Sequence, residues 1–360
     1  MLIIYFFILS NHFMNQFNIY NFVNMPVCIL QYICDTFLYF PDIKNLRKTN
    51  KKCNRIKVKN FDGLDHKING KLNNDILKNY PYLETLDINE NYDVTNINHL
   101  VNLKVLHSCD NNMKNDGIKN LTNLEKLDVS ENYYINNMSH MINLKILHAN
   151  CNNEINDESI KNLINLEELD VDQTENITNV NHLKKLKILR AGTSCGITDN
   201  GITELVNLER LYVSYNKTIT NIKHMKKLKI LNASSNCGIN NNSIEHLIGL
   251  EELHVKQNKK ITNISHLTNL KILRIFDNKK INNEDIKNLI NLEELDMSCT
   301  SKITHLNHMK KLKILDASGT KINDNGIKEL VHLENLNTNS NIRDVRHFVN
   351  LKYLNGVMIR

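Results

Sequence analysis

From Leu83 onward the chain repeats one phrase, L-x-x-L-x-L/V/A, in which apolar residues recur at fixed intervals between polar ones. Successive copies begin 20, 21, 20, 22, 20, 22, 20, 22, 20, 22, 20, 21 and 18 residues apart. The alternation within each copy is typical of a short strand with one buried face. A period of about 20 residues predicts a solenoid in which every copy adds one strand.

The residue after the first leucine of each copy alternates between Glu and Lys. The fourteen positions are Glu84, Lys104, Glu125, Lys145, Glu167, Lys187, Glu209, Lys229, Glu251, Lys271, Glu293, Lys313, Glu334 and Lys352. Because neighbouring strands lie about 4.8 Å apart, these side chains should form a ladder of opposite charges along one edge. Each exposed pair is worth about 0.2 to 1 kcal/mol, against roughly 1.5 to 3 kcal/mol for a buried Leu or Ile. We therefore expect the leucines to hold the stack and the ladder to favour one register.

Two repeat types alternate. Residues 166–183 carry the linking stretch ENITNVNHL, whereas residues 186–205 carry SCGITDNGITEL, where Asp199 is expected to cap a short helix. The second type resembles the cysteine-containing leucine-rich repeat, and the first resembles a shorter type with I-T-N-I. The resemblance implies an α/β solenoid, a leucine-rich-repeat horseshoe with a parallel sheet on its concave face. Upstream, Phe61, Leu64, His66 and Asn69 fit the same template 22 residues before Leu83 and predict a degenerate first repeat over 61–82.

Residues 25–56 resemble an F-box, whose usual pattern is L-P-x-E-I-L, I-x-x-x-L, D-L-x-x-L-R and K-x-W. The matching positions are Pro26, Ile29, Leu30, Ile33, Leu38, Asp42, Ile43, Leu46, Arg47 and Lys51. Met25, Cys28 and Cys53 depart from the pattern. The resemblance implies a small all-α domain over 25–60 that binds a Skp-type adaptor. The adaptor-binding residues would be Pro26, Ile29, Leu30, Ile33, Leu38 and Leu46.

The chain would then have three parts: an extension over 1–24, the F-box-like domain over 25–60 and the repeat domain over 61–360, made of the degenerate repeat and 14 others. The apolar run Met1–Leu9 has no basic leader and is too short to span a bilayer, so we expect a disordered or adventitious extension. The combination indicates the substrate-recognition subunit of a Skp-cullin-F-box ubiquitin ligase. The alternative is an adaptor-free protein-binding scaffold whose N-terminal helices cap the solenoid.

Composition and motifs favour a non-catalytic cytoplasmic or nuclear protein with neither a nucleic acid nor a membrane partner. The net charge of +6 is spread through alternating signs, which is weak support for nucleic acid binding. The eight cysteines include no C-x-x-C pair, which favours reduced thiols over disulfides or zinc. Histidines recur once per double repeat, too far apart to share a metal, and are expected to bond backbone groups. We expect no cofactor and no metal.

The outward-pointing strand positions are the remaining candidate site. They include a central basic and aromatic cluster made of Arg190, Arg210, Tyr212, His254, Lys256, Arg274 and Phe276. Such a cluster fits capture of an acidic or phosphorylated segment of a target protein; otherwise it is a solvated face. A row of apolar residues lies on the same face: Val105, Ile146, Ile188, Ile230, Ile272 and Ile314. This row either belongs to a binding surface or is covered by the stems of long charged neighbours.

Overall fold

The computed structural model describes residues 59–61, 72–338 and 341–359, which fall into two compact units, residues 1–144 and 145–360. The first contains β1 (Asn60–Phe61), α6 (Asn74–Leu77), β2 (Thr85–Asp87), β3 (Val105–His107), α7 (Asn115–Ile118) and β4 (Lys126–Asp128). The second contains β5 (Ile146–His148), α8 (Asp157–Ile160), β6 (Glu168–Asp170), β7 (Ile188–Arg190), the 3-10 helix η2 (Asp199–Gly201), β8 (Arg210–Tyr212), β9 (Ile230–Asn232), α9 (Asn241–Ile244), β10 (Glu252–His254), β11 (Ile272–Arg274), α10 (Asn283–Ile286), β12 (Glu294–Asp296), β13 (Ile314–Asp316), α11 (Asp324–Ile327), β14 (Asn335–Asn337), β15 (Tyr353–Leu354) and β16 (Val357–Met358).

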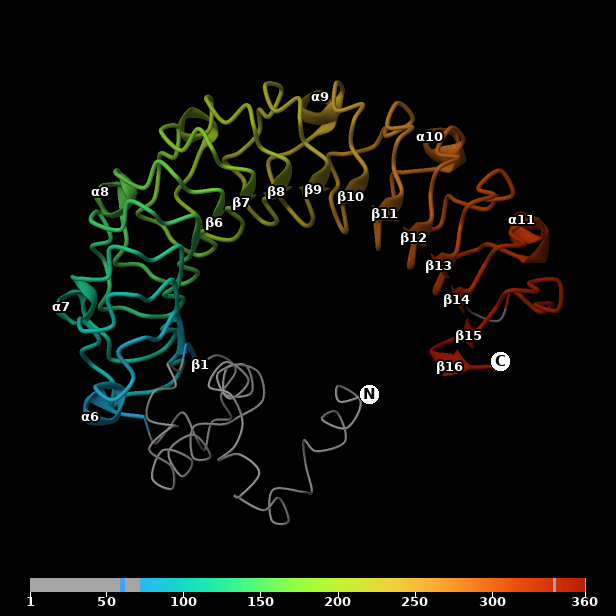
Figure 1. Ribbon diagram of the computed structural model, residues 1–360. Coiled ribbons are helices and arrows are strands. Elements are labelled where there is room, and N and C mark those ends of the chain that lie inside the picture. Colours follow the sequence, from blue (N-terminus) through green and yellow to red (C-terminus); the bar gives the residue numbers. More distant parts are fainter. Residues whose placement is uncertain (1–58, 62–71, 339–340, 360) are drawn as a thin grey trace, which may run out of the picture. The chain divides into compact units, whose positions relative to one another are not determined.

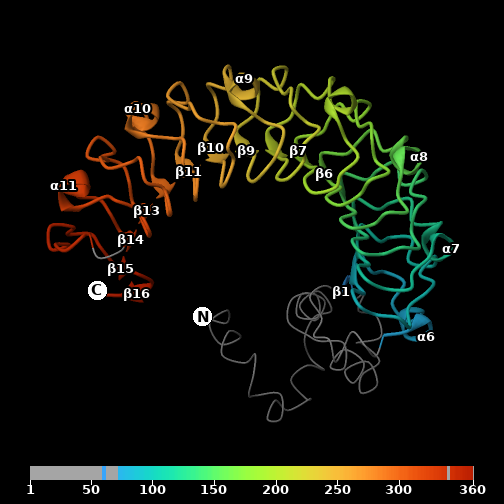
Figure 2. The ribbon, with the colours of Figure 1, turned by 180° about the vertical axis from the view of Figure 1, so that it is seen from behind.

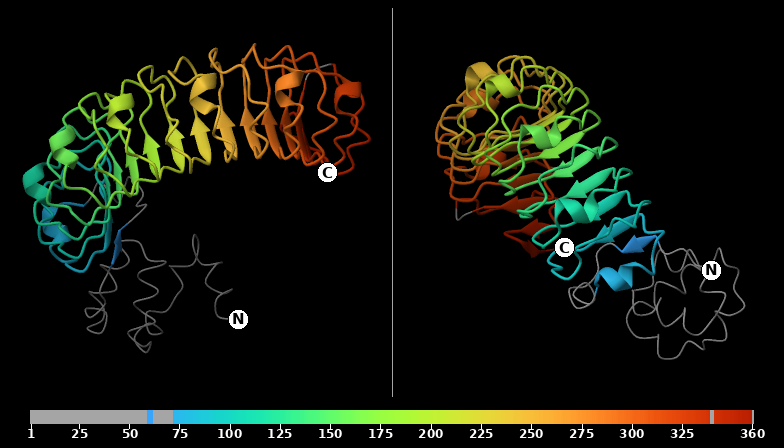
Figure 3. Two further views of the ribbon diagram at one scale, coloured as in Figure 1. Left: turned by 90° about the horizontal axis from the view of Figure 1, so that it is seen from above. Right: turned by 90° about the vertical axis from the view of Figure 1, so that its left-hand side faces the viewer.

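Within each unit the strands pair in chain order. In residues 145–360 they line the concave side of a coil, and helices α8 to α11 lie on its convex side (Figures 1 and 2). The strands from β5 to β15 are parallel and lie side by side (Figure 3). The expected parallel-sheet solenoid is therefore confirmed.

The leucine at the centre of each three-residue strand holds the stack together. Leu169 lies between Leu147 and Leu189 in the neighbouring strands, and all three are fully buried. The residues on either side of it, Glu168 and Asp170, point outward and are half-buried. This is the alternation expected from the sequence, and it places the predicted face residues on one surface.

Buried asparagines hold the turns that follow the strands. Asn216 donates to the carbonyl of Ala191 at 2.8 Å and accepts from the backbone N–H groups of Thr218 and Ile219. Asn258 makes the corresponding bonds one double repeat later. These amides satisfy backbone groups that would otherwise be buried without a partner. Sequence reasoning missed this column, although an Asn at a fixed offset from the strand leucine was visible.

Most of the one-turn helices begin at side-chain caps; the exceptions are α7, which follows Lys114, and η2. Asn156, Asn240 and Asn282 each form a capping box with the third helix residue. The expectation that Asp199 caps its helix was wrong, because Thr198 holds the cap position and makes no side-chain bond. The Asp199 carboxylate instead accepts from the backbone N–H groups of Thr220 and Asn221 in the next repeat.

The Glu/Lys ladder is confirmed. In residues 145–360, Glu167 pairs with Lys187 at 2.7 Å, and Glu251 pairs with both Lys229 at 2.9 Å and Lys271 at 2.7 Å. In the first unit, Glu84 pairs with Lys59 at 2.6 Å and Lys104 at 3.0 Å. Lys59 therefore extends the alternation one repeat upstream of the positions found from the sequence.

The first described strand has a different register from the one expected. Phe61 pairs with Leu86, the strand leucine, and is buried. The repeat pattern in the sequence instead aligns Phe61 with Leu83, which lies three residues before Leu86. The other residues predicted for this repeat, Leu64, His66 and Asn69, lie outside the described residues. So do residues 1–24 and the F-box-like segment over 25–56, which remain predictions.

At the other end of the described chain the sheet finishes in a feature that repeat reasoning did not anticipate. Strands β15 and β16 form an antiparallel hairpin, with Leu354 opposite Val357. Asn355 and Gly356 make its turn with φ values of 51° and 78°. An Asn-Gly pair is the usual residue choice for such a two-residue turn, so the local signal was present.

Core and ladder should respond differently to substitution. Leu169→Ala should lower the free energy of unfolding by roughly 2 to 5 kcal/mol with little salt dependence, because it leaves a cavity between packed strands. Replacing both Glu167 and Glu209 by Lys aligns five lysines along the ladder and should remove only about 1 kcal/mol, with much of the loss recovered in high salt. Urea unfolding at low and high salt checks both. If both variants lost the same stability with the same salt dependence, the leucine column and the Glu/Lys column would have been assigned to the wrong faces of the strands.

Candidate functional site

The outward surface of strands β5 to β14, called here the sheet face, carries the predicted basic and aromatic cluster. All seven of its residues lie in the unit 145–360. The structure does not gather their charges into one positive patch. Most of the cations instead bind acidic residues of neighbouring strands, which divides the cluster into two neutralised groups.

The first group surrounds Glu168. Its Oε1 accepts from Arg190 at 2.6 Å and lies 3.2 Å from Nε2 of His148. Arg190 also lies over the ring of Tyr212, 4.8 Å from its centroid. Burial alone would raise the pKa of Glu168, but the bonds from Arg190 and His148 hold the pKa below its usual value. The Arg190 side chain is thus held in place by Glu168 and Tyr212 within this chain.

The second group surrounds β12. Arg274 donates to Glu294 through Nε and Nη2, at 3.0 and 2.6 Å, and Lys256 lies 3.1 Å from Asp296. His254 contacts Glu252 at 2.7 Å, and burial lowers the pKa of this histidine despite the carboxylate. Phe276, at the end of β11, is half-buried. These cations are already paired within the chain.

Arg210 differs from the other cations of the cluster. It lies on β8, its side chain is exposed, and no ion pair to it is found among the described residues. It lines a hollow of about 260 Å³ on the sheet face, called here the face hollow. The other lining residues are Glu209, Lys229, Ile230, Glu251, Glu252, Lys271 and Ile272. Two members of the isoleucine row therefore lie beside one unpaired cation and an exposed rim of charges.

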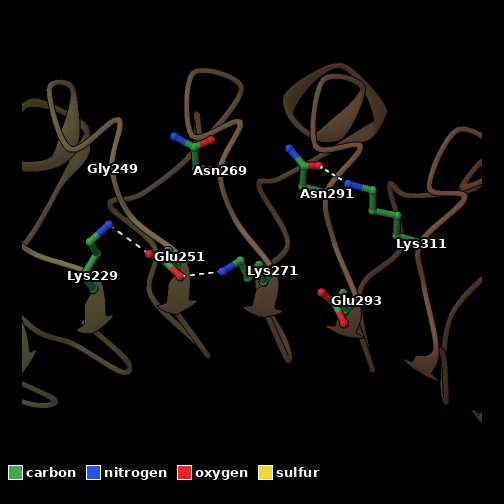
Figure 4. A pocket seen from close by; sticks show the side chains of 8 residues that line it. All are labelled: Lys229, Gly249, Glu251, Asn269, Lys271, Asn291, Glu293 and Lys311. Carbon is green, nitrogen blue, oxygen red and sulfur yellow. Dashed lines mark hydrogen bonds and ion pairs between the residues drawn. The ribbon is translucent and has the colours of Figure 1, made fainter.

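A second hollow of about 310 Å³, the rim hollow, adjoins the ladder and shares Lys229, Glu251 and Lys271 with the face hollow. Figure 4 shows its lining residues, with Glu251 between Lys229 and Lys271, and with Gly249, which has no side chain, beside them. A Cβ built on Gly249 would meet nothing within 4 Å. The matching positions Asn207 and Asn291 each donate to a carbonyl of the preceding repeat. The glycine therefore opens this hollow without being required by the backbone.

The apolar row on the sheet face is partly covered. Ile188, Ile230 and Ile272 are half-buried, and Ile314 is 42% exposed. Long side chains on the adjacent strands, such as Arg210 between Ile188 and Ile230, flank each isoleucine. The row is neither fully shielded nor a continuous apolar patch, and its part in a binding surface stays a prediction.

Most of the histidine column has the structural role expected of it, whereas Nε2 of His99 is buried with no hydrogen-bond partner among the described residues. His182, His224 and His266 each place Nε2 within 2.8 to 3.1 Å of the carbonyl of an isoleucine 22 residues earlier.

Within the residues described, no group of three or more His, Cys, Asp or Glu side chains is arranged to hold a metal ion. Over the same residues, no helix has the length and apolar character needed to cross a membrane.

The cysteines of successive repeats form no disulfides with one another. These residues are Cys109, Cys151, Cys195, Cys237 and Cys299. Burial raises the pKa of Cys195 to about 12, which keeps this thiol protonated and unreactive at neutral pH. The arrangement agrees with the expectation of reduced thiols, although Cys299 is exposed rather than partly buried.

No protein-family model matches this sequence, and no curated protein sequence matches it either. Solved structures do match. An internalin from Listeria monocytogenes is 21% identical with a TM-score of 0.60, covering 77% of this chain and 88% of its own. A leucine-rich-repeat protein of Leptospira interrogans is 23% identical with a TM-score of 0.59, covering 83% and 89%. TLR13, solved in complex with ssRNA13, is 23% identical with a TM-score of 0.52, covering 79% and 47%.

The fold is the leucine-rich-repeat fold. At these identities the likeness extends to the fold and not to partners or activity. Leucine-rich-repeat solenoids present their stacked strands as an extended binding surface, which agrees with the position of the face hollow.

The ladder at the hollows gives a test by pH. Hydrogen bonds from Lys271 and Lys229 lower the pKa of Glu251 from 4.5 to about 2. Because the folded pKa is depressed, this carboxylate stabilises the fold above about pH 4.5, and the contribution is lost as the pH falls toward 2. The stability difference between wild type and Glu251→Gln should therefore be present at neutral pH and shrink near about pH 3. Exposure to solvent keeps the effect modest.

Urea midpoints at the two pH values measure this difference. Glu209→Gln is the matched control, because Glu209 occupies the same ladder but makes no ion pair within 4.0 Å among the described residues. If the stability difference between wild type and Glu251→Gln stayed constant with pH, the two lysines would not be lowering the pKa of this carboxylate.

Proposed function

We propose that the chain is a non-catalytic protein-binding subunit that holds an extended segment of a partner protein on the sheet face. The face hollow supports this proposal most directly. It combines Ile230 and Ile272, which offer apolar contact, with Arg210, an exposed cation that no acidic side chain of the described residues neutralises. An aliphatic residue beside a carboxylate or phosphate in the partner would complement both features.

The finer proposal is that this subunit selects substrates for a Skp-cullin-F-box ubiquitin ligase. Its support is the resemblance of residues 25–56 to an F-box, together with a repeat domain of the kind that commonly follows one. The adaptor would bind Pro26, Ile29, Leu30, Ile33, Leu38 and Leu46, and the repeats would hold the target near the partner subunits that carry out the chemistry. The competing proposal is an adaptor-free scaffold with the same sheet-face site.

Adaptor binding separates these two proposals. Replacing Pro26, Ile29 and Leu30 together by Ala should abolish capture of a purified Skp-type adaptor, since truncating an interface anchor commonly costs at least about 2 kcal/mol. Biolayer interferometry with the full chain measures it. Unchanged circular dichroism in the variant would show that the repeat domain remains folded. Wild-type protein that binds no adaptor at micromolar concentration would leave the scaffold as the function.

Partner capture tests the sheet face. Arg210→Glu should remove the partners that co-purify from cytosol, because it reverses the unpaired charge at the face hollow while leaving adaptor binding intact. Arg274→Glu is an informative comparison, since Arg274 is already bound to Glu294 and should contribute less directly. Quantitative mass spectrometry of the captured proteins is the readout. Arg210→Glu that retains every wild-type partner would place the binding site elsewhere.

A further inference from the structure

Lysines that lie far apart in the sequence are brought together on the flank that follows the C-terminal ends of β10 to β13. Lys260, Lys280 and Lys302 each come seven residues after the strand leucines Leu253, Leu273 and Leu295, which are neighbours in the sheet. Lys321 comes six residues after Leu315 in the next strand. All four are exposed and precede a buried isoleucine. We call these four residues the lysine column.

The position of the column is fixed by the buried asparagines. Asn258 and Asn278 accept from the backbone N–H groups of Lys260 and Lys280, at 2.8 and 3.0 Å. At about 4.8 Å between strands, four successive repeats span roughly 15 Å of sheet. Lys259 and Lys279 lie next to two column members and are also exposed. Six ammonium groups thus share one flank of four repeats.

Most of these lysines lack the ion pairs that neutralise lysines elsewhere in the unit. Ladder lysines such as Lys187, Lys229 and Lys271 bind glutamates of adjacent strands. On the lysine flank, the ion pair found among the described residues is between Lys279 and Asp277, at 3.4 Å. Lys260 donates to a carbonyl, that of Cys237, at 2.8 Å. Like charges stacked in neighbouring repeats repel one another, and an external anion would relieve that repulsion.

Nearby acidic side chains are engaged in other contacts. Glu284 binds Lys287 at 2.6 Å, and Asp285 accepts from the backbone of Asn282 at the start of α10. Asp324 accepts from the backbone N–H groups of Arg343 and Asp344. The column is therefore the part of this flank that is open to an anionic ligand.

We propose that the lysine column is a binding site for the phosphate backbone of a single-stranded nucleic acid. A line of point charges at near-constant spacing matches a linear polyanion with regularly spaced phosphates. Phe276, which is half-buried, lies between the end of β11 and Lys280 and offers a ring face for a base. Tyr215, which is 57% exposed, follows β8, two strands before the first strand of the column, and offers a second ring to a longer segment. The exposed aliphatic residues of the same repeats, such as Ile248 and Ile290, precede the strands instead. Among the described residues of these repeats, the lysine flank has no exposed aliphatic side chain that could anchor it to a lipid surface.

From the sequence we expect no nucleic acid partner, because the net charge of +6 is spread through alternating signs and the lysine pairs, about 20 residues apart, form no long basic run. Because the repeats stack, lysines that are about 20 residues apart in the sequence become neighbours and form one cluster. The site is on a different surface from the face hollow, so it is independent of the proposed capture of a partner protein.

Fluorescence anisotropy with a labelled oligouridine of about fifteen nucleotides tests the site. Lys260, Lys280, Lys302 and Lys321 are replaced together by Gln. Each phosphate contact adds about 0.7 to the slope of log affinity against log salt, so the variant should lose about 2.8 from that slope and bind at least about tenfold more weakly at low salt. The matched control replaces Lys185, Lys227, Lys310 and Lys311, on the flank that precedes the strands, and should retain the wild-type slope.

Wild-type protein that does not bind the oligonucleotide at low salt would overturn the proposal, as would equal losses in both quadruple variants. Poly-L-glutamate and vesicles of equal parts phosphatidylcholine and phosphatidylserine are the comparison ligands. Tighter column-dependent binding of either would assign the column to an acidic protein or a lipid surface instead. Thermal unfolding of both variants separates lost binding from lost folding. The column variant should match or exceed wild type because repulsion is removed, whereas the control variant should be slightly less stable because it loses the Lys310–Glu329 ion pair and the hydrogen bonds of the other three lysines to asparagines.

Discussion

The stacking of one leucine per strand is the contact on which the structure depends. A single repeat has a three-residue strand and at most one turn of helix, too little to bury its own apolar face. Leu169 becomes fully buried because Leu147 and Leu189 lie on either side of it in register. Every other column, polar or charged, inherits its alignment from this one, so the register of the leucines decides which side chains become neighbours.

That dependence explains why so much of the fold could be predicted from the sequence. Once the period and the strand leucine are identified, alternation places Glu168 and Asp170 outward, and the ladder position places Glu251 between two lysines. Prediction failed where local geometry departs from the repeat. The register of Phe61, the cap at Thr198 and the hairpin at Asn355 each depend on particular turn contacts rather than on the period.

The candidate site was harder to predict than the fold, for a physical reason. The sequence shows that Arg190 and Arg274 share a face, but not that each reaches sideways to a carboxylate of the adjacent strand. A long side chain such as arginine can pair with any of several neighbours. Which ion pairs form determines whether a column of cations is a positive binding patch or a neutral network. Arg210 remained exposed because it lies between Ile188 and Ile230, which offer no carboxylate.

The same reasoning separates the two charged surfaces of residues 145–360. On the sheet face, Arg190, Lys256 and Arg274 each pair with an acidic residue of another strand, so the fold itself neutralises these cations. On the lysine flank, Lys280 and Lys302 follow equivalent turns in neighbouring repeats and have like charges as neighbours. Since stacking forces equivalent positions together whatever their charge, a repeat protein can accumulate a charged surface from residues spaced about 20 apart in the sequence. Charge patterning in such proteins is therefore informative only after it has been assigned to columns.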